Sequence, residues 1–181
     1  MKGKIIFKEV QSFRYKWPWF LVLAVAIFNV VLFGWAMYKQ FYLGEPWGNK
    51  PLSDIGLGVV STLILLLMFA VFCLFHFQTL HLEIDEGFIR YKFPPFINST
   101  KSLKSTDVSE LYVRTYSPIS EFGGWGYRGI LRKNQAYNVS GNKGLQIVFT
   151  NGKKLLIGTE KPDQLKQAIA QLKENWGTQD G

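Results

Sequence analysis

Two long apolar segments dominate the first half of the chain. Residues 55–77 run for 23 positions without an Asp, Glu, Lys or Arg, and residues 18–38 run for 21 positions in the same way. At about 1.5 Å of rise per residue, a helix over 55–77 would be roughly 34 Å long, enough to cross a hydrocarbon core of about 30 Å. A buried core helix is the alternative, but a helix of that kind is seldom apolar on every side. We therefore expect a transmembrane hairpin over residues 18–78, with helices at about 18–38 and 55–77.

The first apolar segment is distinct from a cleaved signal peptide. Its apolar region is longer than the 7 to 15 residues typical of signal peptides, and it ends in bulky aromatic residues rather than small ones. Asn29 lies near the centre of this segment, and an amide in lipid needs a hydrogen-bonding partner. We expect Asn29 to make an intramembrane polar contact, for which a second copy of the chain is one candidate.

Positive charge flanks the outer ends of the two segments. Five Lys or Arg precede the first segment, two lie in the connection between the segments, and four follow the second within about thirty residues. The positive-inside rule then predicts both termini in the cytoplasm and the connection outside.

The basic residues 1–17 allow two interpretations. Ile6, Val10, Phe13 and Trp17 have helical spacing, which predicts a short amphipathic helix in the headgroup region. The alternative is a basic tail that only sets the topology.

Beyond residue 78 the hydrophobic period changes from helical to alternating. Alternation predicts a hairpin over residues 81–93 that turns at 85–87, a long strand over 108–116, and short strands near 127–131 and 135–139. Residues 145–149 and 153–157 flank Asn151-Gly152, which predicts a hairpin with a two-residue type I′ turn. The chain ends in a helical stripe made of Leu165, Ile169, Leu172 and Trp176. We expect six or seven strands in a curved sheet or open barrel, covered by this last helix.

Three glycine-rich motifs accompany these strands: residues 122–128 (FGGWGYR), 136–144 (AYNVSGNKG) and 156–159 (LIGT). With the strand order and the final helix, they resemble small bacterial membrane proteins that carry a pleckstrin-homology-like domain. The resemblance covers roughly residues 80–176 and the preceding hairpin. It implies an α+β membrane protein of the bacterial cytoplasmic (inner) membrane, with a PH-like barrel or sandwich of about seven strands over 79–176 and a tail over 177–181.

One departure from the wider PH class concerns its lipid ligands. Phosphoinositide-binding members use a basic loop between their first two strands, whereas here that loop is expected to be Asp85-Glu86-Gly87. Its acidic residues would repel a phosphate, so the sequence disfavours headgroup recognition of that kind.

Residues 124–129 match the dinucleotide-binding pattern G-x-G-x-x-G, but their context does not fit it. The residues that follow are strand-like, and residues 148–150 hold no acid where the ribose-binding carboxylate should stand. The glycines instead suit a tight loop, and we expect an interaction loop that includes Trp125, Tyr127, Arg128, Asn142 and Lys143. The alternative is that Trp125 folds back onto the core.

No arrangement of side chains in the sequence predicts a reaction. Cys73 is the only cysteine, His76 and His81 are five residues apart and do not share a helix face, and no nucleophile stands beside a base. Attraction to a membrane surface explains the net charge of +8, so the charge does not require a nucleic-acid partner.

We expect a membrane-anchored interaction or scaffold module. We expect no enzyme activity, cofactor, metal or small-molecule substrate. The partners of the module would be the lipid bilayer and another membrane protein or a second copy. The alternatives are an accessory subunit of a membrane transport or enzyme complex, using Asn29 and the histidines, and a module that binds anionic lipid.

Overall fold

The computed structural model describes residues 3–13, 17–129 and 133–179. The chain divides into two compact units. Residues Arg14–His76 form one unit, and Met1–Phe13 together with Phe77–Gly181 form the other.

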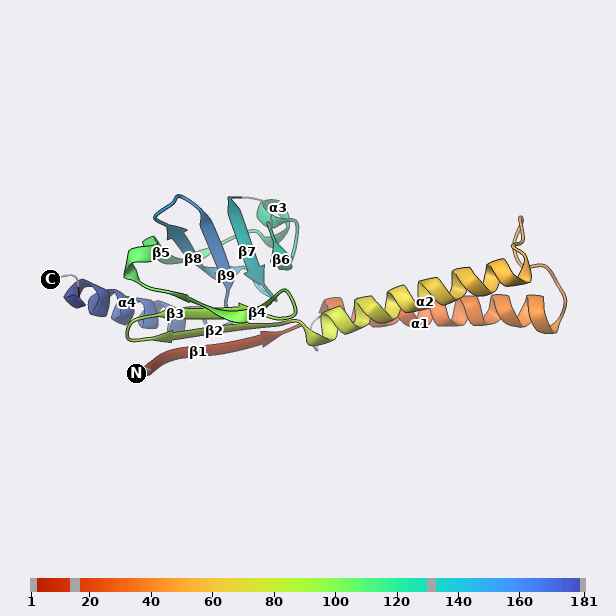
Figure 1. Ribbon diagram of the computed structural model, residues 1–181, viewed down its shortest axis with the longest axis horizontal. Helices are drawn as coiled ribbons and strands as arrows, with labels where there is room; N and C mark the ends of the chain where they lie inside the picture. The colour runs from red at the N-terminus through yellow and green to blue at the C-terminus, as the bar shows by residue number, and fades with distance from the viewer. Residues whose placement is uncertain (1–2, 14–16, 130–132, 180–181) are drawn as a thin grey trace. The chain divides into compact units, whose positions relative to one another are not determined.

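The first unit is a helical hairpin. Helix α1 (Trp17–Met37) continues through a short π-helix, η1 (Tyr38–Tyr42), and α2 (Asp54–Phe77) runs back beside α1 (Figure 1). The two helices therefore begin and end close to the predicted bounds. Only 11% of each apolar window is buried, because the helices cover each other along one narrow side. A buried core helix would be covered on most sides, so the hairpin has the length and the exposed apolar surface to cross a membrane.

Specific contacts join the helices at both ends of the hairpin. The ring of Trp19 lies 4.6 Å from that of Phe72 and 5.6 Å from that of His76. At the other end, Nε2 of Gln40 donates hydrogen bonds to the Leu52 carbonyl at 2.9 Å and to Asp54 Oδ1 at 2.8 Å. These contacts hold the two helices in antiparallel register.

The second unit contains two sheets, of which sheet 1 is a four-stranded antiparallel meander. Its strands are β1 (Ile5–Ser12), β2 (Thr79–Asp85), β3 (Ile89–Phe93) and β4 (Ile97–Leu103), in that order. β1 precedes the helical hairpin in the chain and β2 follows it, and the two strands pair from Ile5 opposite Asp85 to Ser12 opposite Thr79. The helical hairpin is therefore inserted between two neighbouring strands of one sheet.

The helix predicted within residues 1–17 is wrong, because residues 5–12 form a strand. Phe7, Glu9 and Gln11 are buried at a spacing of two residues, while Lys8 and Val10 between them are exposed. Residues spaced by two share one face of a strand, and pairing with β2 outweighs the weak helical pattern.

Sheet 2 has five strands in the order β5-β8-β9-β7-β6. They are β5 (Val108–Thr115), β6 (Gly126–Arg128), β7 (Asn134–Asn138), β8 (Lys143–Phe149) and β9 (Lys154–Gly158). All neighbours are antiparallel except β7 and β9, which are parallel. The predicted strand near 127–131 falls partly outside the described residues. Together the two sheets have nine strands within the described residues, eight of them (β2 to β9) in residues 79–176, where about seven were expected.

The turn between β8 and β9 is one residue longer than predicted. The Phe149 amide donates to the Lys153 carbonyl at 2.8 Å, and the Gly152 amide donates to the Phe149 carbonyl at 2.9 Å. The loop therefore has three residues, with Gly152 at a φ of +77°. A three-residue hairpin loop commonly ends in a left-handed glycine of this kind.

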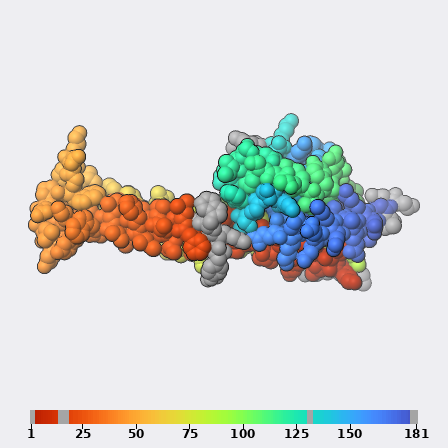
Figure 2. Space-filling model, turned by 180° about the vertical axis from the view of Figure 1, so that it is seen from behind, coloured from red at the N-terminus to blue at the C-terminus, as the bar shows by residue number. Residues whose placement is uncertain are grey.

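Helix α4 (Pro162–Gln179) covers the space between the sheets. It contacts β1 and β2 of sheet 1 and β5 and β8 of sheet 2, and Figure 2 shows it in blue beside the red of β1. Leu165 and Leu172 are fully buried, as the helical stripe predicted. The Trp176 indole N–H also donates to the Gly87 carbonyl at 3.0 Å. The helix continues to residue 179, so the tail predicted at 177–181 is helical over its first three residues. Short helices α3 (Pro118–Phe122) and η2 (Ser105–Asp107) complete the α+β unit.

Candidate functional site

The three glycine-rich motifs meet around one buried side chain, Asn138. Its Oδ1 accepts a hydrogen bond from the Gly126 amide at 2.8 Å, and its Nδ2 donates to the Tyr116 hydroxyl at 3.0 Å. Asn138 is fully buried. A Cβ added at Gly158 would lie 2.9 Å from the Asn138 Cβ, so the third motif needs glycine where it passes the second. The motifs therefore build an internal polar network.

The same network reaches strand β1. Glu9 is 4% exposed, and its two carboxylate oxygens accept hydrogen bonds from the Thr159 hydroxyl at 2.6 Å and the Glu160 amide at 2.8 Å. Gln11 donates from Nε2 to the Gly158 carbonyl at 2.7 Å. The segment before the helical hairpin is thus bonded to the segment that leads into α4.

The predicted interaction loop is brought together in part. The Trp125 indole N–H donates to the Gly141 carbonyl at 3.0 Å, so the loop after α3 and the turn before β8 are neighbours. Arg128 is exposed, and its Nε donates back to the Trp125 carbonyl at 2.9 Å. Trp125 is half-buried, so its side chain is neither fully exposed in an interaction loop nor fully folded back onto the core.

Tyr127 belongs to an aromatic cluster, and its ring stacks with those of Phe96 and Tyr137. Its ring lies 5.1 Å from that of Phe96 at an interplanar angle of 9°, and 4.9 Å from that of Tyr137 at 21°. This stack joins sheet 2 to the turn between β3 and β4. Burial and the nearby Tyr127 raise the pKa of Tyr91 to about 12, and the same causes raise the pKa of Tyr137. Because its ring packs against Phe96 and Tyr137, Tyr127 contributes to the core of the unit rather than to an exposed interaction loop.

We define the loop surface by four of the exposed side chains on α3, β6 and the start of β8 with the turn before it: Ile119, Arg128, Asn142 and Lys143. Ile119 is 69% exposed on α3, and its carbonyl accepts the Gly123 amide at 2.9 Å. The sequence did not single out Ile119, because one isoleucine in a short segment carries no periodicity. An exposed apolar side chain beside cationic and amide groups is a common composition for a contact surface.

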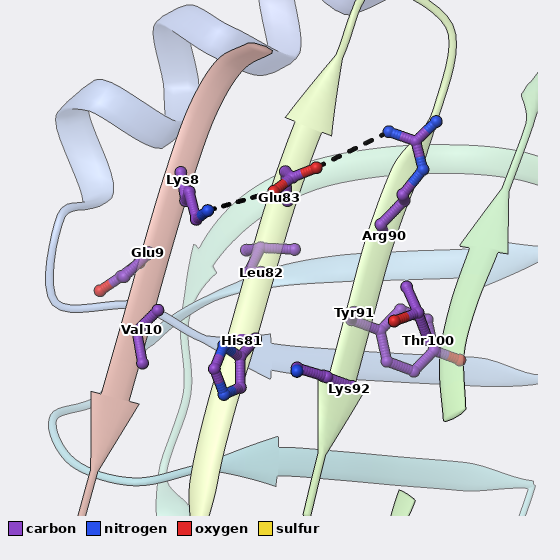
Figure 3. A pocket seen from close by; sticks show the side chains of 10 residues that line it. All are labelled: Lys8, Glu9, Val10, His81, Leu82, Glu83, Arg90, Tyr91, Lys92 and Thr100. Carbon is purple, nitrogen blue, oxygen red and sulfur yellow. Dashed lines mark ion pairs between the residues drawn. The ribbon is translucent and has the colours of Figure 1, made fainter. Parts of the chain in front are cut away.

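A second polar surface lies on the outer face of sheet 1. We define the basic face as Lys8 from β1, His81 and Glu83 from β2, and Arg90 and Lys92 from β3. Figure 3 shows these side chains on neighbouring strands around a shallow hollow of about 410 Å³, which Val10 and Thr100 also line. The residues of the basic face alternate with buried residues along each strand. Lys8 on β1 and His81 on β2 are neighbours on this face although some seventy residues separate them in the chain.

Electrostatics on the basic face favour neutral His81. Burial, together with the positive charges of Lys92 and Lys8, lowers the pKa of the imidazole. Glu83 lies 3.6 Å from Lys8 and 3.8 Å from Arg90, measured between nitrogen and oxygen. The face thus combines one shared carboxylate with several cationic groups.

The turn at residues 85–87 has a structural role different from the one expected. It joins β2 to β3, whereas the connection between the first two strands of sheet 1 is the helical hairpin. Burial would raise the pKa of the Asp85 carboxyl, but hydrogen bonds from the Gly87 amide, the Arg90 guanidinium and the Phe88 amide hold it below its usual value. The turn therefore does not join the first two strands of sheet 1, as the sequence argument about phosphate binding assumed, and whether the domain binds phosphate stays a prediction.

In the helical hairpin, the amide of Asn29 is bonded within its own helix. Nδ2 of Asn29 donates to the Val25 carbonyl at 2.8 Å, and the Ser61 hydroxyl donates to the Leu57 carbonyl in the same local way. A contact of Asn29 with a second copy stays a prediction. His76 lies on α2 while His81 lies on β2, so the two histidines belong to different units.

Within the described residues, no group of three or more His, Cys, Asp and Glu side chains is arranged to hold a metal ion. No family model, curated protein or solved structure matches the chain in the comparisons made with each. The arrangement of side chains is thus the basis for any statement about function.

Proposed function

We propose that the chain is a non-enzymatic interaction module anchored in a membrane by its helical hairpin. The observation that carries the proposal is the pairing of β1 with β2, from Ser12 opposite Thr79 onward, on either side of a hairpin with exposed apolar surface. A domain whose neighbouring strands flank two spans is attached to the bilayer at two points.

The strand pairing also supports a definite topology. If both helices cross the bilayer, the segments before α1 and after α2 lie on one side, as neighbouring strands of one sheet require. The positive-inside rule then favours the cytoplasmic side of a bacterial inner membrane for both termini. The two sheets, with a C-terminal helix that contacts both, support a PH-like assignment for the second unit. The β6–β7 hairpin and the parallel β7–β9 pair are additions to the fold that this assignment implies.

Anchoring suits an interaction role because both partners then share one plane. Tethering raises the effective concentration of any partner held in the same membrane. The loop surface, with exposed Ile119, Arg128 and Lys143, is the contact that we assign to another membrane protein or a second copy.

Anchoring and topology are tested by cysteine labelling in intact cells. Cys73 is the only cysteine, so Cys73→Ser gives a blank background. In that background we expect Asn49→Cys to react with a membrane-impermeant maleimide from outside, and Gly3→Cys and Lys153→Cys to react only after permeabilisation. Different accessibility of residues 3 and 153 would contradict the shared side, and release of the chain by alkaline carbonate would contradict anchoring.

The interaction role is tested by photo-crosslinking in native membranes. A photoreactive residue at Asn142 should give a discrete adduct with a membrane protein or a second copy. The matched control is the same residue at Asn151, an exposed asparagine in the β8–β9 turn. Equal adducts at both positions, or none at Asn142, would argue against the loop surface as a contact.

A further inference from the structure

The basic face carries more positive charge than its acidic neighbours neutralise. Glu83 is shared between Lys8 and Arg90, and Arg90 also pairs with the buried Asp85. Lys92 forms no ion pair with an acidic side chain in the part of the chain that the structure describes. Lys92 is therefore a cation available to a ligand.

The hollow beside Lys92 has the size and the hydrogen-bonding groups to take an anion. It measures about 410 Å³, and Lys92, His81 and the Thr100 hydroxyl line it together with the aliphatic side chain of Val10 (Figure 3). An ammonium group and a hydroxyl can donate to phosphate oxygens, and so can the imidazole nitrogen of His81 that does not contact the Thr79 hydroxyl. Val10 is 53% exposed and offers an apolar contact at the edge.

The position of His81 indicates where the anion would lie. His81 stands between Val10 of β1 and Lys92 of β3 in the register of the sheet, and Lys8 lies opposite Glu83 two residues further along. Its pKa is lowered by burial and by the cations Lys92 and Lys8. An anion between these groups would offset that repulsion and favour the protonated imidazole.

We propose that this hollow binds the phosphate group of an anionic phospholipid headgroup. His81 follows Phe77, the last residue of α2, by four residues, which span at most about 13 Å of extended chain. Where α2 ends at the bilayer surface, phospholipid headgroups are the most concentrated phosphate groups within that reach, and the surplus positive charge of the basic face favours those with a net negative charge. This inference depends on the membrane insertion proposed above, and it names the lipid that the anchored domain recognises.

Binding is measured on the full chain in neutral detergent micelles. A short-chain phosphatidylglycerol should bind saturably, and short-chain phosphatidylcholine should bind at least fivefold more weakly. Lys92→Gln should weaken phosphatidylglycerol binding at least fivefold. The matched control is Lys101→Gln, which removes one charge from an exposed lysine on β4 that does not line the hollow, and it should change binding less than twofold.

Three outcomes would overturn the proposal. Equal losses for Lys92→Gln and Lys101→Gln would mean diffuse attraction to a positive surface. Equal affinity for phosphatidylcholine would remove the need for net negative charge. Inorganic phosphate that binds as tightly as phosphatidylglycerol would make the ligand a free phosphate compound.

A second readout follows the His81 imidazole by NMR in lipid nanodiscs. Its pKa should be higher by at least 0.5 in nanodiscs with anionic lipid than in zwitterionic ones, and Lys92→Gln should remove the difference. A second reporter, made by Lys101→His, measures the diffuse surface potential, and an equal rise there would contradict a specific site. A chain that stays embedded and shows no such difference disproves the lipid site alone, whereas loss of anchoring disproves the proposed function itself.

Discussion

The motif network around Asn138 and the basic face of sheet 1 are polar regions of the second unit that are built in opposite ways. In the network, the amide of Asn138 is fully buried and both of its polar atoms are bonded inside the protein. On the basic face, the polar groups reach solvent around a hollow, and Lys92 has no acidic partner among the described residues. The conspicuous motifs hold the fold together, while strands of ordinary composition present a surface to a ligand.

Replacing Asn138 should give the largest effect on stability. Asn138→Ala leaves the buried Gly126 amide without its acceptor and the Tyr116 hydroxyl without its donor. We therefore expect the free energy needed to open strands β8 and β9 to hydrogen exchange to fall by about 2–4 kcal/mol. Hydrogen exchange of β8 and β9 amides in the full chain in micelles measures it. The control Asn142→Ala, at an exposed position, should change it by less than about 0.5 kcal/mol. Similar losses for both variants would remove the contrast between the two regions.

Replacing Glu9 tests whether the segment before the hairpin belongs to the network. Glu9→Gln exchanges a buried carboxylate that accepts two hydrogen bonds for an amide with only one accepting oxygen, and we expect a loss of about 1–3 kcal/mol. The control is Glu110→Gln, the same substitution at an exposed position. If hydrogen exchange of the β8 and β9 amides is unaffected by Glu9→Gln, β1 does not stabilise the rest of the unit.

Acidification should reveal His81 through a smaller change. Its pKa in the folded protein lies below the ordinary value of 6.5, so its contribution to stability is complete above pH 6.5 and is lost as pH falls toward the folded pKa. The opening free energy should therefore decline below pH 6.5 by less than either loss above. The charged groups that face His81 are Lys8 of β1, Glu83 of β2 and Lys92 of β3. A decline that persists in His81→Gln would assign it to another group.

The smallest effects are expected for the lysines of the basic face. Lys8 is 62% exposed in its side chain and its ion pair with Glu83 spans 3.6 Å, so Lys8→Gln should change stability by less than about 0.5 kcal/mol. Lys92→Gln, at a residue without an ion pair among the described ones, should be as mild. A loss above 1 kcal/mol from either variant would show that the basic face stabilises the fold, as the network does.

The features that the sequence predicted well are those set within a single segment. The helices at 18–38 and 55–77 follow from local composition, and the stripe from Leu165 to Trp176 follows from local periodicity. Strand β4 was missed because residues 97–102 are mostly polar and exposed, and only pairing with β3 makes them a strand. The turn at Asn151-Gly152 was recognised, while its length depended on the register of β8 and β9.

The candidate sites divide along the same line. The proximity of Trp125 to the turn at Gly141 agreed with the grouping of residues made from the motifs, whereas the ring of Tyr127 lies in the aromatic stack. The basic face was not assembled from the sequence, because its residues lie on β1, β2 and β3, with the hairpin between the first two.

Local composition by itself determined that this protein has two long apolar helices, a strand-rich second half and an amphipathic last helix, since each property depends on neighbours along the chain. Only the tertiary structure decided that residues 5–12 are a strand, that the glycine motifs enclose Asn138, and that Lys8, His81 and Lys92 share one surface. The physical reason is that hydrogen bonds between strands join residues about seventy positions apart, and their partners leave no mark on the local pattern.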